Sequence, residues 1–423
     1  MKKLILGHLV YLYTPLGIAA CIWGLLHGGN WVWLGAGIFA FNIIVDSLAT
    51  GIHPKGAATN TDGKPLGVPA ILNLMMYLQY PLFVCLQLAL AWRVYEYVAG
   101  APPGSGEILG VSVSHGITGW QLVGAILSAG MHQGLGIIFG HELSHTKGSG
   151  FFVSRLIMAL SGAAHFCFAH SFNHHVELGR AWLGPDNNKL GDDCDPATAP
   201  RGRSLYKHLF VSYVGQSYYG IKSEARRLKK HGKPFLSPSN RWIQGYLMSV
   251  PTIALFTYAG WNGGGFQGLL IGFLVMFEVW LISNFELEAL NYMEHYGLIR
   301  VKGAPIAYRH SWDNDNFFTS WAFIEIGRQA DHHENGETHF WELKNVGPAP
   351  DGAPNACIGY YHEFALALIP PIWHAMMKKK LAVWDRDFAT PEERALASEI
   401  NKKVGYVVKP NAIEDINLNV SYT

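Results

Sequence analysis

The residues of this sequence best suited to metal chemistry are histidines gathered in four clusters. The first cluster is His141 and His145, within the stretch 140–147. On a helix this four-residue spacing puts both imidazoles on one face, close enough to share a metal ion. The other three clusters are His170 with His174 and His175, then His295, then His332 with His333. Because a tetrahedral zinc site needs four protein ligands at most, this surplus of histidines predicts two metal ions.

The ligand type also indicates which metal binds. Nitrogen-rich sites with open positions suit iron that must bind oxygen. Three acids, Glu142, Glu294 and Asp331, lie beside the clusters, and each could fix the tautomer of a ligand histidine. On a helix, Glu325 would share one face with Gln329 and with His332 and His333, so Glu325 is a further candidate ligand. His310 is assigned to the surroundings of the metal or to the protein core.

The string His141-Glu-Leu-Ser-His145 has a second possible meaning. In zinc proteases the two histidines of HExxH bind zinc and the glutamate acts as general base. A membrane-embedded HExxH is therefore also compatible with an intramembrane protease. The additional histidines, and the lack of a second Asn/Asp-Gly element on a later apolar segment, argue against that interpretation.

Composition indicates a membrane protein. Charged residues make up 15% of the chain and hydrophobic residues 49%, whereas soluble domains contain about 25% charged residues. The mean hydropathy is +0.12. A formal net charge of +1 implies no nucleic-acid partner. The five cysteines have no CxxC spacing and are predicted to be buried free thiols.

Six segments are long and apolar enough to cross a bilayer. They are 4–26, 31–49, 69–98, 117–140, 243–260 and 266–284. Lys2 and Lys3 precede the first span. The regions 50–68, 141–242 and 285–423 hold nearly all the other lysines and arginines, with Arg93 as the exception, near the far end of the third span. By the positive-inside rule both termini and all four clusters are cytoplasmic. The chain is thus predicted to be one all-α membrane domain, 1–423, with a histidine-rich cap formed by 141–242 and 285–423.

Shorter segments outside these spans are also predicted to be helical. Residues 151–168 form an apolar helix lying on or dipping into the membrane, interrupted by the small residues 161–164. An amphipathic surface helix is expected within 381–403. Thr390 is its candidate N-cap and Pro391 stands in its first turn. The stretches 101–116 and 261–265 are predicted to be a loop and a turn.

The ordered set of clusters resembles the integral-membrane non-haem di-iron hydroxylases, which include alkane hydroxylase and the hydroxylase component of xylene monooxygenase. The motifs shared with that family are His141-Glu-Leu-Ser-His145, His170 with His174-His175, Asn291-Tyr-Met-Glu-His-Tyr-Gly297 and Asp331-His-His333. The resemblance runs nearly end to end, and 193–196 and 384–394 look closer to the xylene branch. It implies six transmembrane helices and a cytoplasmic cap over two irons.

Three positions depart from the pattern of the alkane branch. Gln329 stands where a histidine is expected, four residues before His333. Ala169 replaces a glutamate, and Asn173 occupies a position where glycine is usual. The eight remaining histidines still suffice for two irons, with Glu325 or Gln329 available to complete one of them.

The resemblance implies a monooxygenase of the bacterial inner membrane. It would insert one oxygen atom of O2 into an unactivated C–H bond, such as a methyl group, of a hydrophobic alkyl-aromatic or alkane. The substrate would enter from the membrane lipid through an apolar channel lined by the aromatic residues Phe41, Tyr77, Phe83 and Trp120.

Electrons must come from another protein, because the sequence contains no flavin or nucleotide fingerprint. A ferredoxin- or rubredoxin-type protein with an NAD(P)H reductase is the expected donor. The basic stretch 222–233 is a candidate contact for an acidic donor or for lipid headgroups.

Three alternatives remain open at this point. A membrane desaturase uses the same iron–histidine chemistry but yields an alkene. An intramembrane zinc protease would bind one zinc and need no reductant. A metal carrier would need ionisable residues within the spans, where this sequence offers few, such as Asp46 and Glu278.

Overall fold

The computed structural model describes residues 8–49, 68–108, 110–181, 193–347, 351–356 and 358–407. The described chain is mostly helical and divides into two compact units. Unit 1 comprises Met1–Asn42, Val68–Cys167 and Leu236–Leu287, and unit 2 comprises Ile43–Gly67, Phe168–Phe235 and Glu288–Thr423. The predicted loop 50–68, apart from Val68, lies outside the described residues.

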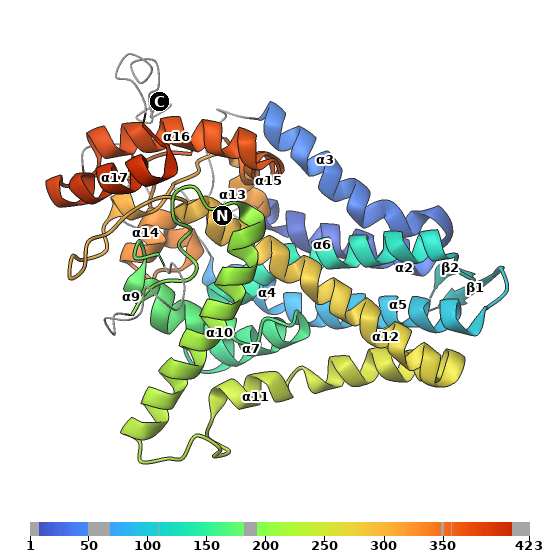
Figure 1. The fold of residues 1–423 in the computed structure, drawn as a ribbon. Helices are drawn as coiled ribbons and strands as arrows, with labels where there is room; N and C mark the ends of the chain where they lie inside the picture. Colours follow the sequence, from blue (N-terminus) through green and yellow to red (C-terminus); the bar gives the residue numbers. More distant parts are fainter. Residues whose placement is uncertain are drawn as a thin grey trace. The chain divides into compact units, whose positions relative to one another are not determined.

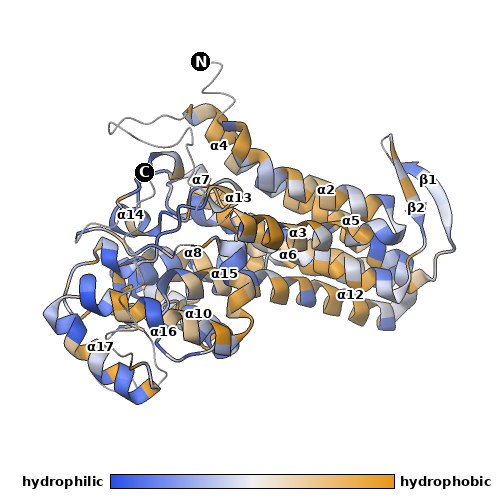
Figure 2. Cartoon of the chain, turned by 90° about the horizontal axis from the view of Figure 1, so that it is seen from above, coloured by the Kyte–Doolittle hydropathy of each residue, from blue (hydrophilic) through white to orange (hydrophobic). Residues whose placement is uncertain are grey.

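Unit 1 consists mainly of apolar helices. They are η1 (Leu9–Leu12), α2 (Tyr13–His27), η2 (Gly29–Trp33), α3 (Leu34–Leu48), α4 (Pro69–Tyr77), α5 (Gln79–Ala99), α6 (Gly119–Ser144), α7 (Ser149–Leu160), α11 (Arg241–Leu247) and most of α12 (Val250–His295). Helices α2, α5 and α6 pack side by side (Figure 1), and apolar residues dominate their surfaces (Figure 2). Five helical segments are long and apolar enough to cross a membrane, which makes this a membrane protein.

The last of these segments, Arg241–His295, is 55 residues long and turns back on itself. Gly264 and Gly265 have non-helical backbone angles, and Gly265 has a φ of 58°, a conformation that glycine adopts without a Cβ clash. The predicted span 243–260 begins in α11 (Arg241–Leu247) and continues in the first arm of α12, and the second arm contains the predicted span 266–284. The second arm continues past Asn284 to His295, so the third histidine cluster lies at its end.

Glycines allow the two arms of α12 to approach closely. A Cβ atom added to Gly268 would clash with the carbonyl oxygen of Gly260, and one added to Gly272 would clash with the carbonyl oxygen of Phe256. Small residues at helix contacts are a common way to pack helices inside membranes. The glycines therefore fix the two arms as an antiparallel pair.

The segment 101–116 is a β-hairpin, which corrects the prediction of a loop. Its strands are β1 (Gly104–Ile108) and β2 (Val111–His115), paired antiparallel. Buried Arg93 connects this hairpin to α2, because its guanidinium donates to the carbonyl oxygens of Leu25 at 2.6 Å and Ser114 at 2.7 Å. This cation outside the positive-inside pattern therefore has a structural role at the end of α5.

The apolar stretch 151–168 is interrupted as predicted. Helix α7 ends at Leu160, Gly162 has a φ of 70°, and the short helix α8 (Phe166–Ala169) follows. Met158, Ala163, Phe166 and Cys167 join Ile137 and Leu287 in a buried core cluster of unit 1.

Unit 2 contains shorter and more polar elements. They are η3 (His170–His174), α9 (His175–Glu177), α10 (Leu205–Lys230), η5 (Tyr308–His310), α13 (Phe317–Ala322), α14 (Gln329–Glu334), η6 (Phe340–Glu342), α15 (Tyr360–Ala367), α16 (Pro370–Asp387) and α17 (Pro391–Val404). The helix expected within 381–403 is two helices, α16 and α17, which pack together (Figure 1). Thr390 caps α17 in a capping box with Glu393, as predicted.

Candidate metal centre

The second histidine cluster lies on a widened helical turn. Residues His170–His174 form a π-helical turn between α8 and α9, a conformation that is frequent at functional sites. The turn brings the ring of His170 to 5.1 Å from that of His174 and 4.6 Å from that of His175. One short segment of unit 2 therefore supplies three imidazoles.

Three histidines from three elements of unit 2 meet in a buried group, named here the inner trio: His174, His295 and His333. The ring centroids are 4.9 Å apart for His174 and His295, and 4.7 Å apart for His333 and each of the other two. Each residue offers a ring nitrogen, and the three nitrogens lie within 4.8 Å of one another. All three side chains are buried.

A second group, the outer trio, consists of His170, His175 and His332. Nitrogen atoms of these residues also lie within 4.8 Å of one another. The Nε2 atoms of His170 and His175 face each other at 3.0 Å, as expected for two ligands directed at one point. The trios adjoin, because the rings of His175 and His333 are 4.3 Å apart. Unit 2 thus brings together six of the eight predicted ligands.

The nitrogen atoms of the inner trio fit a metal ion. Among the described residues, His295 Nε2 and both ring nitrogens of His333 have no hydrogen-bond partner. An unsatisfied buried polar atom costs about 1–3 kcal/mol, and a metal ion bound there would remove that cost. Burial and neighbouring imidazoles hold the pKa of His333 well below its ordinary value. A neutral imidazole is the form that binds metal.

Asp195 orients one member of the inner trio. Its Oδ2 atom lies 2.8 Å from Nδ1 of His174, and backbone N–H groups of Ala197 and Thr198 donate to the same carboxylate at 3.0 Å. Burial alone would raise the pKa of Asp195, but its contacts with His174 and Thr198 outweigh that effect and lower it. The ionised carboxylate therefore keeps the proton on Nδ1 and leaves Nε2 of His174 available to a metal.

His310 lies behind His295. Its carbonyl oxygen lies 3.4 Å from Nδ1 of His295. Both of its ring nitrogens are engaged, because Nε2 lies 2.8 Å from Glu393 Oε1 and Nδ1 accepts a hydrogen bond from the Ala307 N–H at 3.0 Å. These contacts engage both sides of the His310 ring.

The first cluster lies in unit 1, at the C-terminal end of α6. The rings of His141 and His145 are 5.3 Å apart, and nitrogen atoms of the pair lie within 4.8 Å of each other. The ring of Phe166 packs 5.9 Å from that of His141. Glu142, between them, is buried. The predicted shared face of this pair is confirmed.

Glu325 and Asp331, the acids near the last cluster, do not make the contacts that the sequence predicted. Helix α14 begins at Gln329, so Glu325 does not share its face. Glu325 has a φ of 61°, a strained conformation for a residue with a side chain, and its carboxylate lies 3.4 Å from the guanidinium of Arg328. Asp331 accepts hydrogen bonds from the Asn335 amide and the Lys344 N–H, both at 2.8 Å, and these contacts do not orient a ring.

Two further predicted residues, Glu294 and Gln329, are buried and adjacent. The Glu294 carboxyl group lies beside the Gln329 amide and the Tyr360 hydroxyl. This arrangement places polar groups next to His295, the residue that follows Glu294.

The prediction of an aromatic channel is wrong for two residues. Phe41 and Trp120 are 60% and 69% exposed, so they lie on the outside of unit 1. Phe83 is fully buried and would meet any side chain placed at Gly136 of α6. The Tyr77 hydroxyl lies 3.2 Å from that of Ser149.

Sequence reasoning missed Asp195 and Glu393 as supporting residues. Asp195 lies in the stretch 193–196, which the sequence marked only by resemblance. Glu393 is 83 residues from His310 along the chain, and it was recognised only as part of a helix start. No local periodicity reveals such a contact.

This chain is similar to proteins of known function. The profile of the fatty acid desaturase family matches residues 118–364. The chain is 30% identical to the xylene/toluene monooxygenase hydroxylase component of Pseudomonas putida over 94% of this chain and 95% of that protein. It is 32% identical to alkane 1-monooxygenase of Acinetobacter baylyi over 60% and 58% of the two chains. It is 28% identical to alkane 1-monooxygenase 2 of Pseudomonas aeruginosa, over 89% of this chain and 92% of that protein.

Proposed function

The chain belongs to the membrane non-haem iron hydroxylase family that includes the xylene and alkane monooxygenases, and we propose that it hydroxylates a methyl group of an alkyl-aromatic hydrocarbon or an alkane. It is an oxidoreductase of the monooxygenase class. One oxygen atom of O2 enters the C–H bond and the other leaves as water. The balance requires two electrons and two protons from outside the substrate.

The two adjoining trios are the observation on which the proposal rests. They bring six imidazoles together, five of them buried, and nitrogen donors with open positions suit iron that binds oxygen. We propose two irons, with ligands from these six histidines and from His141 and His145. Glu325 is the carboxylate proposed to complete one of them. When bound, the irons would supply the activation of O2.

The protein's own residues orient the ligands and exclude water. Asp195 fixes the tautomer of His174, and the carbonyl oxygen of His310, held in turn by Glu393, faces Nδ1 of His295. The inner trio is buried, so water has little access to it. A dry site protects a reactive oxidant from side reactions.

We propose that the chain is a single hydroxylase domain crossing the bacterial inner membrane six times, with both termini in the cytoplasm. The hairpin formed by Arg241–His295 supports the count, because its 55 residues would span about 80 Å as one straight helix, against a hydrocarbon core of about 30 Å. Each arm is long enough for one crossing.

We propose a ferredoxin- or rubredoxin-type protein, reduced by an NAD(P)H reductase, as electron donor. The sequence has no nucleotide or flavin fingerprint, and the reaction needs electrons one at a time at a metal site. The other proposed binding partners are a hydrophobic small-molecule substrate, O2 and membrane lipid.

Product analysis tests the function. Purified protein in nanodiscs, with ferredoxin, reductase and NADPH, would be given p-xylene, p-cymene or octane under O2 enriched in the heavy isotope of oxygen. The expected product is an alcohol containing one labelled oxygen atom. An alkene without label would identify a desaturase and contradict the proposal.

A further inference from the structure

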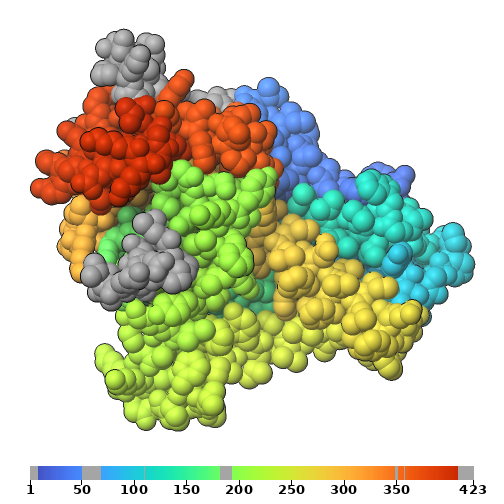
Figure 3. Space-filling view, viewed as in Figure 1, coloured from blue at the N-terminus to red at the C-terminus, as the bar shows by residue number. Residues whose placement is uncertain are grey.

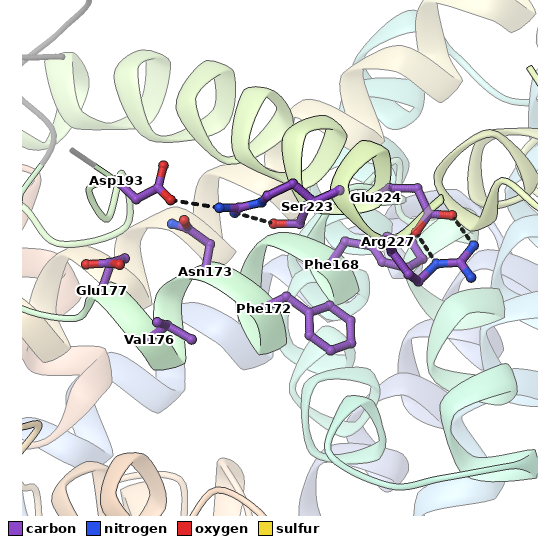
Figure 4. Close-up of a pocket in the computed structure, with 10 residues that line it drawn as sticks. Phe168, Phe172, Asn173, Val176, Glu177, Asp193, Ser223, Glu224 and Arg227 are labelled. Atoms are coloured by element: carbon purple, nitrogen blue, oxygen red, sulfur yellow. Dashed lines mark hydrogen bonds and ion pairs between the residues drawn. The ribbon is translucent and has the colours of Figure 1, made fainter. Parts of the chain in front are cut away.

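A cavity of about 420 Å³ lies in unit 2, behind the segment that contains the second histidine cluster (Figure 4). Phe168, Phe172 and Val176 form its apolar part, and Asp193 and Arg226 stand at its rim. We propose that the electron-donor protein docks over this cavity and that electrons reach the metal centre through the segment 168–177. The inference rests on the proposed oxygenase reaction, which needs external electrons.

The segment 168–177 has two faces. Phe172 and Val176 each lie two residues from a ligand histidine, and residues two apart on a helical segment point to nearly opposite sides. The rings of His170 and His174 therefore point away from Phe172 and Val176, which line the cavity. Phe172 and Val176 are 50% and 55% exposed, although both are apolar. A partner bound against Phe172 and Val176 would be separated from the ligand histidines by the width of one helix.

A second connection joins the cavity to the inner trio. Asp193, at the rim, is held by Lys222 and by Arg226 at 2.9 Å. Two residues later, Asp195 holds His174. The carbonyl oxygen of Cys194, between these two acids, accepts a hydrogen bond from the Asn173 amide at 2.9 Å. This bond holds residues 193–195 against the segment 168–177. The rim is therefore coupled to a ligand through three consecutive residues.

The charges at the rim favour an acidic protein. Helix α10 ends in a basic run, in which Arg226, Lys229 and Lys230 are exposed. The last turns of α10 form part of the visible surface of the molecule (Figure 3). Glu224 pairs with Arg227 at 2.7 Å and Asp193 pairs with Lys222 and Arg226, so Lys229 and Lys230 add positive charge beyond these pairs. An apolar centre beside a charged rim is typical of protein–protein interfaces, and exposed cations speed the approach of an acidic partner.

A protein fits this place better than lipid headgroups do. The surface is hollow, and the carboxylates of Glu177 and Asp193 line it together with the cations. Anionic headgroups would pair with the exposed cations but would not fill the apolar hollow. A protein with its own protruding apolar residue and acidic rim satisfies both features.

The test compares two electron sources on the full chain in nanodiscs. One source is a ferredoxin or a rubredoxin with its reductase, whichever supports faster turnover; the other is dithionite with methyl viologen, which needs no docking. The variant is Lys229→Glu with Lys230→Glu, and the matched control is Lys402→Glu with Lys403→Glu, two exposed lysines of α17.

The α10 variant should raise the KM for the protein donor about tenfold, while turnover with dithionite and the control variant should both change little. Turnover of the unmodified chain with the protein donor should fall as salt rises, because exposed charges are screened. This salt series needs no variant, so it holds even if a variant folds poorly.

An unchanged KM for the donor in the α10 variant, or turnover independent of salt, would overturn the proposal. Weaker binding of this variant to phosphatidylglycerol vesicles, with an unchanged KM for the donor, would assign the cations to lipid headgroups and also overturn it. If no alcohol forms with either electron source, the proposed hydroxylase function has failed, which is a different result.

Discussion

The Nδ1 atom of His174 lies 2.8 Å from the Oδ2 atom of Asp195, and both side chains are buried. The pair joins a predicted ligand to an acid that stands 21 residues away along the chain. A carboxylate behind a ligand histidine fixes its tautomer and increases its basicity.

Asp195→Asn should weaken iron binding about 10- to 100-fold, because the amide no longer provides the charge that holds the Nδ1 proton of His174. Iron retained per chain during titration with a chelator measures the effect. Asp193→Asn is the matched control, since Asp193 pairs with Lys222 and Arg226 outside the trios. Equal iron loss in both variants would show that Asp195 has no special role.

Acid should destabilise the contact between His310 and Glu393. Burial would raise the pKa of Glu393, but hydrogen bonds from His310, Arg309 and the Thr390 N–H outweigh it and lower the pKa from 4.5 to about 2. Because the folded pKa is depressed, this stabilisation is complete above the unfolded value of 4.5 and is lost as pH falls towards 2.

The measurement is the thermal unfolding midpoint in detergent through that acidic window. Glu393→Gln should lower the midpoint at neutral pH and flatten its dependence on pH. Glu399 is an exposed position of α17, so Glu399→Gln should show the same dependence of the midpoint on pH as the unmodified chain. A Glu393→Gln curve parallel to that of the unmodified chain would contradict the assignment.

The hairpin of α12 should not tolerate a side chain at its closest contact. Gly268→Ala places a methyl group against the carbonyl oxygen of Gly260, so the arms must separate. The yield of monodisperse protein in detergent should fall sharply. Gly37→Ala, where an added methyl group meets no atom within 4 Å, should purify normally. Equal yields would mean that the arms do not pack as described.

Arg93→Met should destabilise the protein by about 3–5 kcal/mol, because it removes the cation paired with a buried carboxylate, whose other contact is the partly exposed His115 ring. That carboxylate is Glu96, which lies 2.5 Å from the Arg93 guanidinium. Chemical denaturation in mixed micelles measures the loss. Arg93→Met with Glu96→Gln should recover part of it, and no recovery would show that the carbonyl contacts of Arg93 matter more.

Local signals in the sequence predicted much of this protein. The His141–His145 spacing, the turn near Gly264 and the Thr390 cap follow from periodicity, glycine and capping chemistry, all of which act within a few residues. The length of the apolar segments likewise indicated helices that could cross a membrane.

The remaining features depend on contacts between distant residues. Glu393 reaches His310 across 83 positions, and only tertiary packing brings them together. Helical periodicity placed Glu325 on one face with His332, but the backbone is left-handed at Ile324 and Glu325 and the helix starts later. Phe83 is buried, whereas Phe41 and Trp120 are exposed. No local sequence pattern distinguishes these three aromatic residues.

Elemental analysis of the purified protein is the most direct test of the proposed metal centre. We expect two irons per chain and little zinc, bound by the inner and outer trios together with His141 and His145. One zinc without iron would contradict it and favour a protease. A single iron would contradict the second site and direct attention to Gln329, where the alkane branch is expected to have a histidine.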